Sequence, residues 1–387
     1  MGQRFAAALS EHPNAAVATG EVVGQVLEGL GGAGPSGGPD LAMVFVTPVH
    51  AGDLEEIART VRAALLPGAL LGCAAVSVLG GDREVERGPA ISLWAGRTGP
   101  VTPFHLTVGA SPDGMTFTGW PEAIPDDASA LLLIPDPFTF PTEDLLRRLE
   151  DDRPGMPVVG GMASAARAPG GNRLVIDDQV VNVGAVGAFL GPSMDVTTVV
   201  SQGCRPVGHP FVVTRAEQNI VYELAGRPAV ERLKEVAAAL PDEDRELLAD
   251  LVQIGRVIDE RKLDFAPGDF LVRTVVGADP TSGALRVGDI VEVGSTAQFQ
   301  VRDAVSADED LRRMVGGRTA EAALVFTCNG RGTNLFPEPH HDASVVSETL
   351  GGPPIAGMFC AGELGPIGGH NFMHGFTASV VLLSLAG

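Results

Sequence analysis

AALVFTCN, residues 322–329, is a continuous apolar run that ends in polar residues, and it is one of three such runs in the chain. The others are LAMVFVTP from Leu41 and ALLLIPDP from Ala130. A short apolar run without polar alternation is typical of a strand buried on both faces of a sheet. We therefore predict that each run is the first strand of a repeated unit.

Each run precedes the same succession of elements. A helix-like stretch comes first, then a second apolar run that ends in glycines, and then a third strand-like run: AISLWAG, VNVGAVGAFL or TASVVLLSL. Helix N-caps are expected at Asp53, Thr142 and Asp342. Roughly thirty residues separate the first two strands, enough for the crossover that joins parallel neighbours. The repeat is thus predicted to be a β-α-β-β unit. The fold class is α/β, with mixed β-sheets layered with helices.

Length and composition set the domain organisation. At 387 residues the chain exceeds the usual size of one hydrophobic core, so two domains are expected. Residues 1–39 are predicted to be a helical segment with a Gly-rich link (GGAGPSGGPD, residues 31–40), residues 40–216 the first α/β domain, and residues 217–387 the second. Within the second, the sequence predicts a strand, a turn at Gly226, a helix opened by Pro228, a further helix, and then a β-meander.

Charge and cysteine usage exclude some partners. A formal charge of −21 without a local run of Lys or Arg makes nucleic acid and acidic membrane surfaces poor partners. The four cysteines are widely spaced, and the N-terminus lacks a signal-peptide pattern, so we expect reduced thiols in a cytoplasmic protein. The longest apolar run, VVLLSL, is far shorter than the roughly 20 residues of a membrane-spanning helix.

Comparing the three copies separates architecture from chemistry. When Gly72, Gly160 and Gly357 are aligned, Cys360 falls opposite Ala75 and Ala163. A position that holds alanine elsewhere favours a small buried thiol at Cys360. Glu363 and the stretch GPIGGHNFMHGF that follows it have no counterpart of the same chemistry. Any specialised site is therefore expected in the third copy.

The third copy also carries CNGRGTN, residues 328–334, directly after its first strand. Glycines there allow backbone N–H groups to point together at a bound group, and Arg331 offers a forked donor for a carboxylate. Loops that follow parallel neighbouring strands leave the same edge of a sheet, which is where open α/β sheets bind ligands. We therefore expect the loops 328–334 and 359–376 to share a ligand site.

An amino-acid-like zwitterion would need a cation for its carboxylate and an anion for its ammonium group. Arg331 or Arg273 together with Glu363 would supply that pair. The predicted ligand-binding residues are Arg273, Cys328, Asn329, Gly330, Arg331, Glu363, Asn371 and His374. A structural role is open for each: Arg331 as a turn arginine, Glu363 as a carboxylate that accepts backbone N–H bonds, and the glycines as turn formers.

An enzymatic alternative uses the same stretch. Cys360 and His374 could act as thiolate and base, with Glu363 or Asn371 orienting the imidazole. His370 and His374 have the spacing of a metal pair on a helix, but the surrounding glycines argue against a helix there. We therefore expect no metal and no cofactor.

Three stretches together resemble the FIST proteins: GCRPVGHPFVVTRAEQNIVYELAGRPAVERL, FLVRTVVGADPTSGALRVGDIVEVGSTAQFQVRDA, and the pair CNGRGTNLF and IAGMFCAGELGPIGGHNFMHGFTAS. Residues 40–214 resemble the FIST N domain and residues 216–365 the FIST C domain. The resemblance implies a ligand-sensing module of intracellular signal transduction whose ligand is an amino acid or related metabolite. Because the chain carries no output domain, it also implies a separate signalling partner protein. A scaffold that only presents a protein-binding surface is a further alternative.

Overall fold

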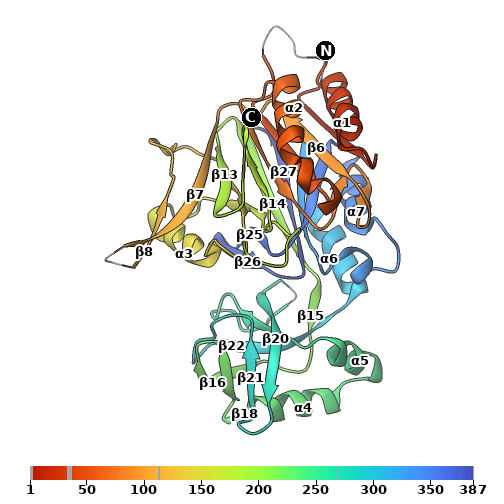
Figure 1. Cartoon of the computed structure of the whole chain (residues 1–387). Helices are drawn as coiled ribbons and strands as arrows, with labels where there is room; N and C mark the ends of the chain where they lie inside the picture. The colour runs from red at the N-terminus through yellow and green to blue at the C-terminus, as the bar shows by residue number, and fades with distance from the viewer. Residues whose placement is uncertain (1–2, 33–36, 112–113, 267, 387) are drawn as a thin grey trace. The chain divides into compact units, whose positions relative to one another are not determined.

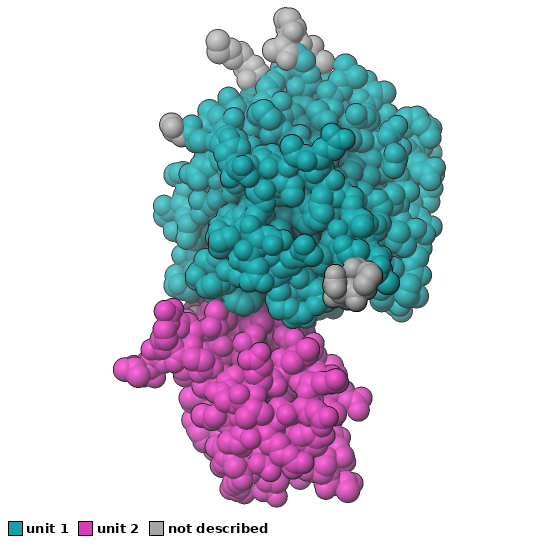
Figure 2. Space-filling view, turned by 90° about the vertical axis from the view of Figure 1, so that its left-hand side faces the viewer, with its two compact units in different colours: residues 1–200, 311–373, 377–387 teal, residues 201–310, 374–376 magenta. Residues whose placement is uncertain are grey.

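The computed structural model describes residues 3–32, 37–111, 114–266 and 268–386. They form two compact units (Figure 2): unit 1 contains residues 1–200, 311–373 and 377–387, and unit 2 contains residues 201–310 and 374–376. The division differs from the predicted ranges 40–216 and 217–387, because nearly all of the third repeat copy belongs to unit 1. Its strands bury their apolar side chains in one core with strands of the first two copies.

The three copies have the predicted strands and helix, drawn in Figure 1. In each copy the first two strands pair in parallel and the third pairs antiparallel with the first. The elements are β2 (Leu41–Val46), α2 (Leu54–Leu65), β3 (Ala69–Ala74) and β6 (Ile91–Gly96); β9 (Ala130–Pro135), α3 (Thr142–Asp152), β10 (Val158–Gly161) and β13 (Ala185–Leu190); and β23 (Ala322–Cys328), α7 (His341–Leu350), β24 (Ile355–Cys360) and β27 (Thr377–Leu385). The predicted β-α-β-β order is therefore confirmed.

Each copy also contains a hairpin that the sequence pattern did not reveal. The hairpins are β4 (Val78–Gly80) with β5 (Arg83–Val85), β11 (Leu174–Ile176) with β12 (Gln179–Val181), and β25 (Glu363–Ile367) with β26 (His370–His374). Their strands are separated by two residues, and the first of the two has positive φ in every case: Gly81, Asp177 and Gly368. That geometry is typical of the tight turns that match strand twist.

The hairpins are exchanged among the copies. Sheet orders are β1-β6-β2-β3-β11-β12, β26-β25-β10-β9-β13-β7-β8 and β14-β27-β23-β24-β4-β5. The hairpin of the first copy thus pairs within the sheet of the third copy. The hairpin of the second copy lies in the sheet of the first copy, and the hairpin of the third copy lies in the sheet of the second. Outer strands complete the sheets: β1 (Phe5–Ser10), β7 (Val101–Ser111), β8 (Gly114–Thr118) and β14 (Met194–Gln202). The three sheets are therefore interlocked copies of one arrangement.

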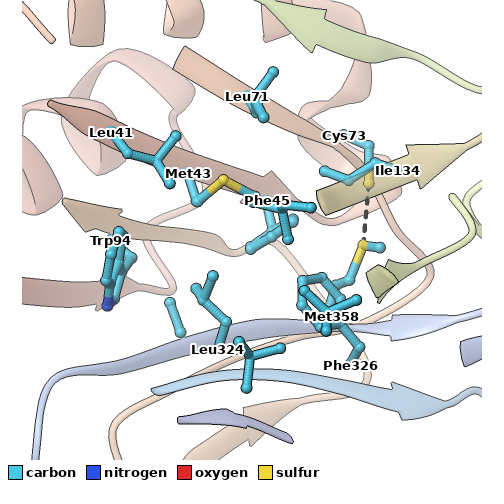
Figure 3. Close-up of a cluster of buried hydrophobic side chains, with 14 of the residues drawn as sticks. Leu41, Met43, Phe45, Leu71, Cys73, Trp94, Ile134, Leu324, Phe326 and Met358 are labelled. Atoms are coloured by element: carbon cyan, nitrogen blue, oxygen red, sulfur yellow. Dashed lines mark hydrogen bonds between the residues drawn. The ribbon is translucent and has the colours of Figure 1, made fainter. Parts of the chain in front are cut away.

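The three sheets enclose a common apolar core. Figure 3 shows Phe45 of β2, Ile134 of β9 and Phe326 of β23 converging there, and the Cys73 thiol lies 3.1 Å from the Met358 sulfur. Helices cover the other faces: α1 (Ala15–Gly29) and α2 cover the first sheet, α3 the second, and α7 with the end of α6 (Ala304–Val315) the third. Both faces of the first strands are therefore buried, as their sequences predict.

The aligned glycines are explained by backbone packing. A Cβ at Gly72, Gly160 or Gly357 would lie 1.8, 2.1 or 1.9 Å from a carbonyl oxygen of the parallel neighbouring strand. No side chain fits at that separation. The aligned glycines are therefore required in all three copies by the close approach of two parallel strands, and not only by a turn.

The N-terminal prediction was partly wrong. Residues 5–10 form β1, because they pair along their whole length with β6, and only α1 is helical. Asn14 begins α1, its side chain accepting a hydrogen bond from Val17 N at 3.1 Å. Residues 33–36 of the predicted Gly-rich link lie outside the described residues.

The predicted helix starts are displaced in two of three cases. Asp53, which ends the short 3-10 helix η1 (Pro48–Asp53), is the N-cap of α2. Thr142 is the first residue of α3 behind Pro141, and Asp342 lies inside α7, whose N-cap is His340. Asp342 therefore does not cap its helix and is available for another role.

Unit 2 contains a closed antiparallel barrel. Its strands pair in the order β22, β16, β17, β21, β20 and β19, and β19 pairs again with β22. These are β16 (Phe211–Glu217), β17 (Ile220–Leu224), β19 (Gln253–Val257), β20 (Phe270–Asp279), β21 (Ala284–Val287) and β22 (Thr296–Arg302); β15 (Cys204–Pro206) adds to β22 and β18 (Arg227–Pro228) to β17. Helices α4 (Ala229–Ala239) and α5 (Asp242–Asp250) follow as predicted. The predicted meander holds only for β20 and β21, since β22 returns to β16 and β19 to close the barrel.

Candidate functional site

The two special loops of the third copy leave the same sheet edge. Strands β23 and β24 are parallel and in register, so that Cys328 lies beside Cys360, and Asn329 N donates to Cys360 O at 2.9 Å. The predicted meeting of strand ends is therefore confirmed. The 3-10 helix η2 (Gly332–Asn334) follows the first loop directly.

Arg331 is held in a buried ion pair. Its Nε and Nη2 donate to the two carboxylate oxygens of Asp342, each at 2.8 Å, and both side chains are fully buried. Thr327 Oγ1 donates to the same carboxylate, and His341 Nδ1 lies 2.9 Å from Asp342 Oδ1. Burial alone would raise the pKa of Asp342, but the Arg331 guanidinium holds that pKa well below its usual value. The forked donor expected to bind a ligand carboxylate is thus engaged by a carboxylate of the chain.

Aromatic rings complete the surroundings of this pair. The Phe336 and His341 rings are stacked with centroids 3.4 Å apart, and the Arg331 guanidinium lies 5.1 Å from the Phe336 ring centre. One guanidinium nitrogen, Nη1, has no hydrogen-bond partner within the described part of the chain. That nitrogen is the donor still open to a further group.

The exchanged hairpin of the first copy supports the same loop. Glu86 accepts hydrogen bonds from Thr333 N at 2.9 Å and from Thr333 Oγ1 at 2.7 Å. Glu84 Oε1 accepts from Ala343 N at 2.9 Å, in the first turn of α7. Burial first, and then the negative charge of Asp342, raise the pKa of Glu84 to about 8. Two copies of the repeat therefore contribute acidic groups to one cluster.

Glu363 is a carboxyl group at a position that is apolar in the other copies. In each sheet, one hairpin residue lies opposite the aligned glycine of the receiving copy, and Glu363 is the residue just before it in the third hairpin. The residues at the same point of the first and second hairpins are Val78 and Leu174, and both belong to the common core. The residue opposite Glu363 is Gly161, whereas Met358 and Cys73 lie opposite Val78 and Leu174. A smaller opposite residue therefore accompanies the polar substitution.

The two oxygens of Glu363 differ. Oε2 accepts from Thr377 N at 3.1 Å and from Thr377 Oγ1 at 2.8 Å, while Oε1 has no hydrogen-bond partner among the described residues. Burial raises the pKa of Glu363 to about 8, against the opposing effects of the Thr377 hydrogen bonds, the Cys328 thiol and the Arg331 charge. Glu363, Cys328 and Arg331 are therefore close enough to interact, which brings three of the predicted residues together.

The other predicted residues of the first loop lie around this group. Cys328 is buried, and its sulfur accepts from Gly330 N at 3.5 Å. Asn329 is exposed, and its carbonyl oxygen accepts from Asn334 Nδ2 at 3.0 Å. The loop thus has a buried side at Cys328 and an exposed side at Asn329.

Three predicted residues are placed elsewhere or otherwise engaged. Asn371 Oδ1 accepts from Val158 N, and its Nδ2 donates to Met156 O, both at 2.8 Å, so its amide fixes β26 to the adjacent backbone. Arg273 lies on β20 in unit 2, with its Nε 3.1 Å from Asp289 Oδ2. His374 is buried at the end of β26. Their ligand roles remain predictions.

Cys360 has the environment of a core residue. It shares the common core with Ala75 and Ala163, and a Cβ at Gly161 would lie 2.3 Å from its sulfur. Burial raises the pKa of the Cys360 thiol well above its usual value, and the nearby Glu363 adds to this effect. A nucleophilic thiolate requires the opposite shift. The geometry therefore favours the structural interpretation of Cys360 over the catalytic one.

No metal site or disulfide emerges from these groups. His370 and His374 lie on a strand, and the described residues contain no group of three His, Cys, Asp or Glu side chains arranged to hold a metal ion. None of the four cysteines, all within the described residues, forms a disulfide, and all are buried. No helix in the described ranges is long and apolar enough to cross a membrane.

Sequence reasoning missed the residues that complete the cluster: Asp342, Glu84, Glu86 and Thr377. Asp342 stood out only as a helix cap. No sequence signal pointed to Glu84 or Glu86, because the strands of the β4–β5 hairpin have only three residues each and pair within the sheet of another copy.

Two family models cover most of the chain. The FIST N domain matches residues 40–227, and the FIST C domain matches residues 229–366. The chain belongs to the FIST family. FIST domains are generally assigned as sensory domains of signal transduction. The FIST C match contains both the later barrel strands and most of the third repeat copy, so it crosses the boundary between the compact units.

Two relatives from mycobacteria are similar in sequence to nearly the whole chain. An uncharacterized protein of Mycobacterium tuberculosis is 42% identical over 386 residues, which span 98% of this chain and 99% of its own. An uncharacterized protein of Mycobacterium bovis is 42% identical over 378 residues, 96% of each chain. This FIST chain is therefore similar to relatives over nearly its full length.

Proposed function

We propose that this FIST protein is a cytoplasmic sensory module that binds a small ligand at the cluster around Arg331, Cys328 and Glu363. The ligand would be an amino acid or a related small metabolite. The observation that carries the proposal is Glu363: a fully buried carboxyl group with an unpartnered oxygen, at a position filled by Val78 and Leu174 in the sister copies. Buried polar atoms without partners are uncommon in native proteins and need a reason.

Among the described residues of the cluster, Glu84 Oε2, Arg331 Nη1 and Glu363 Oε1 lack hydrogen-bond partners, and the last two suit the two ends of a zwitterion. Arg331 Nη1 would donate to the ligand carboxylate, and Glu363 Oε1 would accept from the ligand ammonium group. Cys328, Asn329 and Gly330 would line the approach from the exposed side of the loop. Because Arg331 is already paired with Asp342, the ligand would add to this ion pair instead of replacing it.

Binding of an ammonium group should release a proton. The pKa of Glu363 is raised to about 8 by burial, so the carboxyl group is mostly protonated at pH 7. A positive charge beside it favours the ionised form and lowers its pKa. Ligand binding near pH 7 would therefore be coupled to proton release, which would also transmit the binding event to a separate signalling partner protein through a change in local charge.

Isothermal titration of the full chain with the standard amino acids and related amines and acids tests the proposal. We expect at least one amino acid to bind with an apparent enthalpy that changes between buffers of different ionisation heat at pH 7. Glu363→Gln should weaken that binding at least tenfold and abolish the buffer dependence, whereas Glu150→Gln on α3 should do neither. The proposal is overturned if no panel member binds, or if Glu363→Gln binds like wild type.

A further inference from the structure

A second polar cluster lies in unit 2, on one face of its barrel. Strand β22 carries Gln298 and Gln300, and Gln300 lies directly opposite Gln253 of β19. Cross-strand partners and residues two apart on a strand share a face. Gln253 and Gln300 are fully buried, and Gln298 is 8% exposed. Three glutamine amides are therefore gathered on a buried sheet surface, where apolar side chains are the rule.

A fourth glutamine, Gln202, adds to the cluster from the strand that leads into β15. Its Nε2 donates to Phe270 O at 2.7 Å, on β20, which is the other neighbour of β19. Gln298 Nε2 donates to Gly208 O at 3.1 Å. These two bonds hold the Gln202 and Gln298 amides to the backbone, whereas the directly opposed Gln253 and Gln300 form the central pair of the cluster.

The central amides have unused hydrogen-bonding capacity. Within the described ranges, neither the oxygen nor the nitrogen of Gln253 or Gln300 has a hydrogen-bond partner, and the Gln202 oxygen also lacks one. The surface thus offers three carbonyl acceptors and two NH2 donors. Such groups are normally satisfied when buried, because losing water without gaining a partner is unfavourable.

Local packing holds the central amides in place. A Cβ at Gly255 would lie 2.7 Å from Gln300 Nε2 and 2.8 Å from Phe270 Cβ, so only a glycine allows the Gln300 amide to lie across β19. Phe270, Val257 and Val272 supply apolar surface beside it. The nearest cation along β22, Arg302, has its guanidinium 5.1 Å from the Phe376 ring centre.

We propose that the Gln253–Gln300 face binds a small neutral molecule that presents N–H donors next to a carbonyl oxygen. A carboxamide, a cyclic urea and a nucleobase edge share this chemistry, and a glutamine amide pairs with such an edge through one donor and one acceptor. The mixed set of donors and acceptors matches a neutral polar edge better than a carboxylate, which only accepts. The site is separate from the Glu363 cluster and does not depend on the function proposed for it.

Titration calorimetry of the full chain with nicotinamide, hydantoin, uracil and adenine tests this site. The four probes also distinguish a carboxamide, a cyclic urea and a nucleobase as the class of ligand. We expect one of these probes to bind, and we expect the double variant Gln253→Met, Gln300→Met to weaken its affinity at least tenfold. Methionine keeps a similar unbranched shape without the amide, so the variant should unfold at the wild-type temperature or above it when no probe is present. Gln179→Met, at an exposed glutamine of β12 in unit 1, is the matched control and should change the affinity less than twofold.

The same probes soaked into crystals of the wild-type protein give a second readout that needs no variant. Density for a probe within hydrogen-bond distance of Gln253 and Gln300 would support the site. Failure of all four probes to bind at millimolar concentration, or equal binding by the double methionine variant, would overturn it. Ordered waters that satisfy all five amide atoms in the presence of probe would overturn it too.

Discussion

The third repeat copy differs from the first two at the position of Glu363, and this difference separates scaffold from chemistry. Val78 and Leu174 fill the common core, whereas Glu363 places a carboxyl group at the same point of its exchanged hairpin. The second copy also has a buried acid, Asp136, but its two oxygens accept from Asn172 Nδ2 at 2.7 Å and Thr139 Oγ1 at 2.6 Å. A buried acid in this scaffold is thus satisfied in one copy and left with an unused oxygen in another.

The largest effect should come from breaking the ion pair that is specific to the third copy. Asp342→Ala leaves the Arg331 guanidinium buried without its carboxylate, which should cost about 3–5 kcal/mol of stability. The exposed pair of Arg148 and Asp152 provides the control: Asp152→Ala should cost less than about 1 kcal/mol. Urea unfolding measures both. Equal losses in the two variants would contradict the assigned role of the buried pair.

A double variant sharpens this test. Adding Arg331→Met to Asp342→Ala removes the unpaired charge and should recover part of the lost stability, since replacing both members of a buried pair by apolar groups is often nearly neutral. If the double variant is no more stable than Asp342→Ala, the cost lies in the lost packing and not in the charge.

The second prediction concerns pH. Burial raises the pKa of Glu363 to about 8 from a usual 4.5, so its stabilising effect is fully present below pH 4.5 and is lost as the pH rises through about 8. Within that window a single such group lowers the free energy of unfolding by about 1.4 kcal/mol per pH unit. Glu84, whose pKa is also raised to about 8, adds a similar slope.

Glu363→Gln should therefore remove about half of the decline in stability between pH 5 and pH 8 that these two residues cause. Urea midpoints measured at unit steps of pH give the slopes, and Glu84→Gln is the matched variant from the first copy. Parallel curves for wild type and Glu363→Gln would show that Glu363 ionises in the folded state as it does in the unfolded chain.

The sequence predicted the repeated strands because each is buried on both faces and contains no polar alternation. It could not predict the exchanged hairpins: strands of three residues, such as β4 and β11, are too short to show a period, and their partner strands come from another copy. The same limit hid Glu84. Asp342 was visible only as a helix cap, because its pairing with Arg331 depends on how α7 packs against β23.

The third prediction tests the equivalence of Cys360 with alanine in the sister copies. Cys360→Ala should cost about 1 kcal/mol, the scale of removing one small group from a packed core, and should leave ligand binding unchanged. Native protein should resist iodoacetamide at neutral pH, since a buried thiol with a raised pKa is unreactive. Rapid labelling of Cys360, confirmed by peptide mass spectrometry, would favour the enzymatic alternative.

An effect of similar size should come from the turn of the third hairpin. Gly368 has φ of 61°, close to the 61° of Gly81 and the 53° of Asp177 in the equivalent turns, and no atom lies within 4 Å of a Cβ built there. Gly368→Ala should therefore cost about 1 kcal/mol through backbone strain alone, and Gly368→Asn should cost less, because asparagine tolerates this conformation.

Gly20→Ala on the exposed side of α1 is the opposite control, since alanine replaces glycine in a helix without a clash and should stabilise by about 0.5–1 kcal/mol. The midpoint temperature of thermal unfolding shows whether each variant is less or more stable than wild type. If Gly368→Ala has no cost, the hairpin is held by its pairing with β10 and not by its turn. The exchange of hairpins would then be fixed by the sheets that receive them, and the position of Glu363 would be set by the second copy of the repeat.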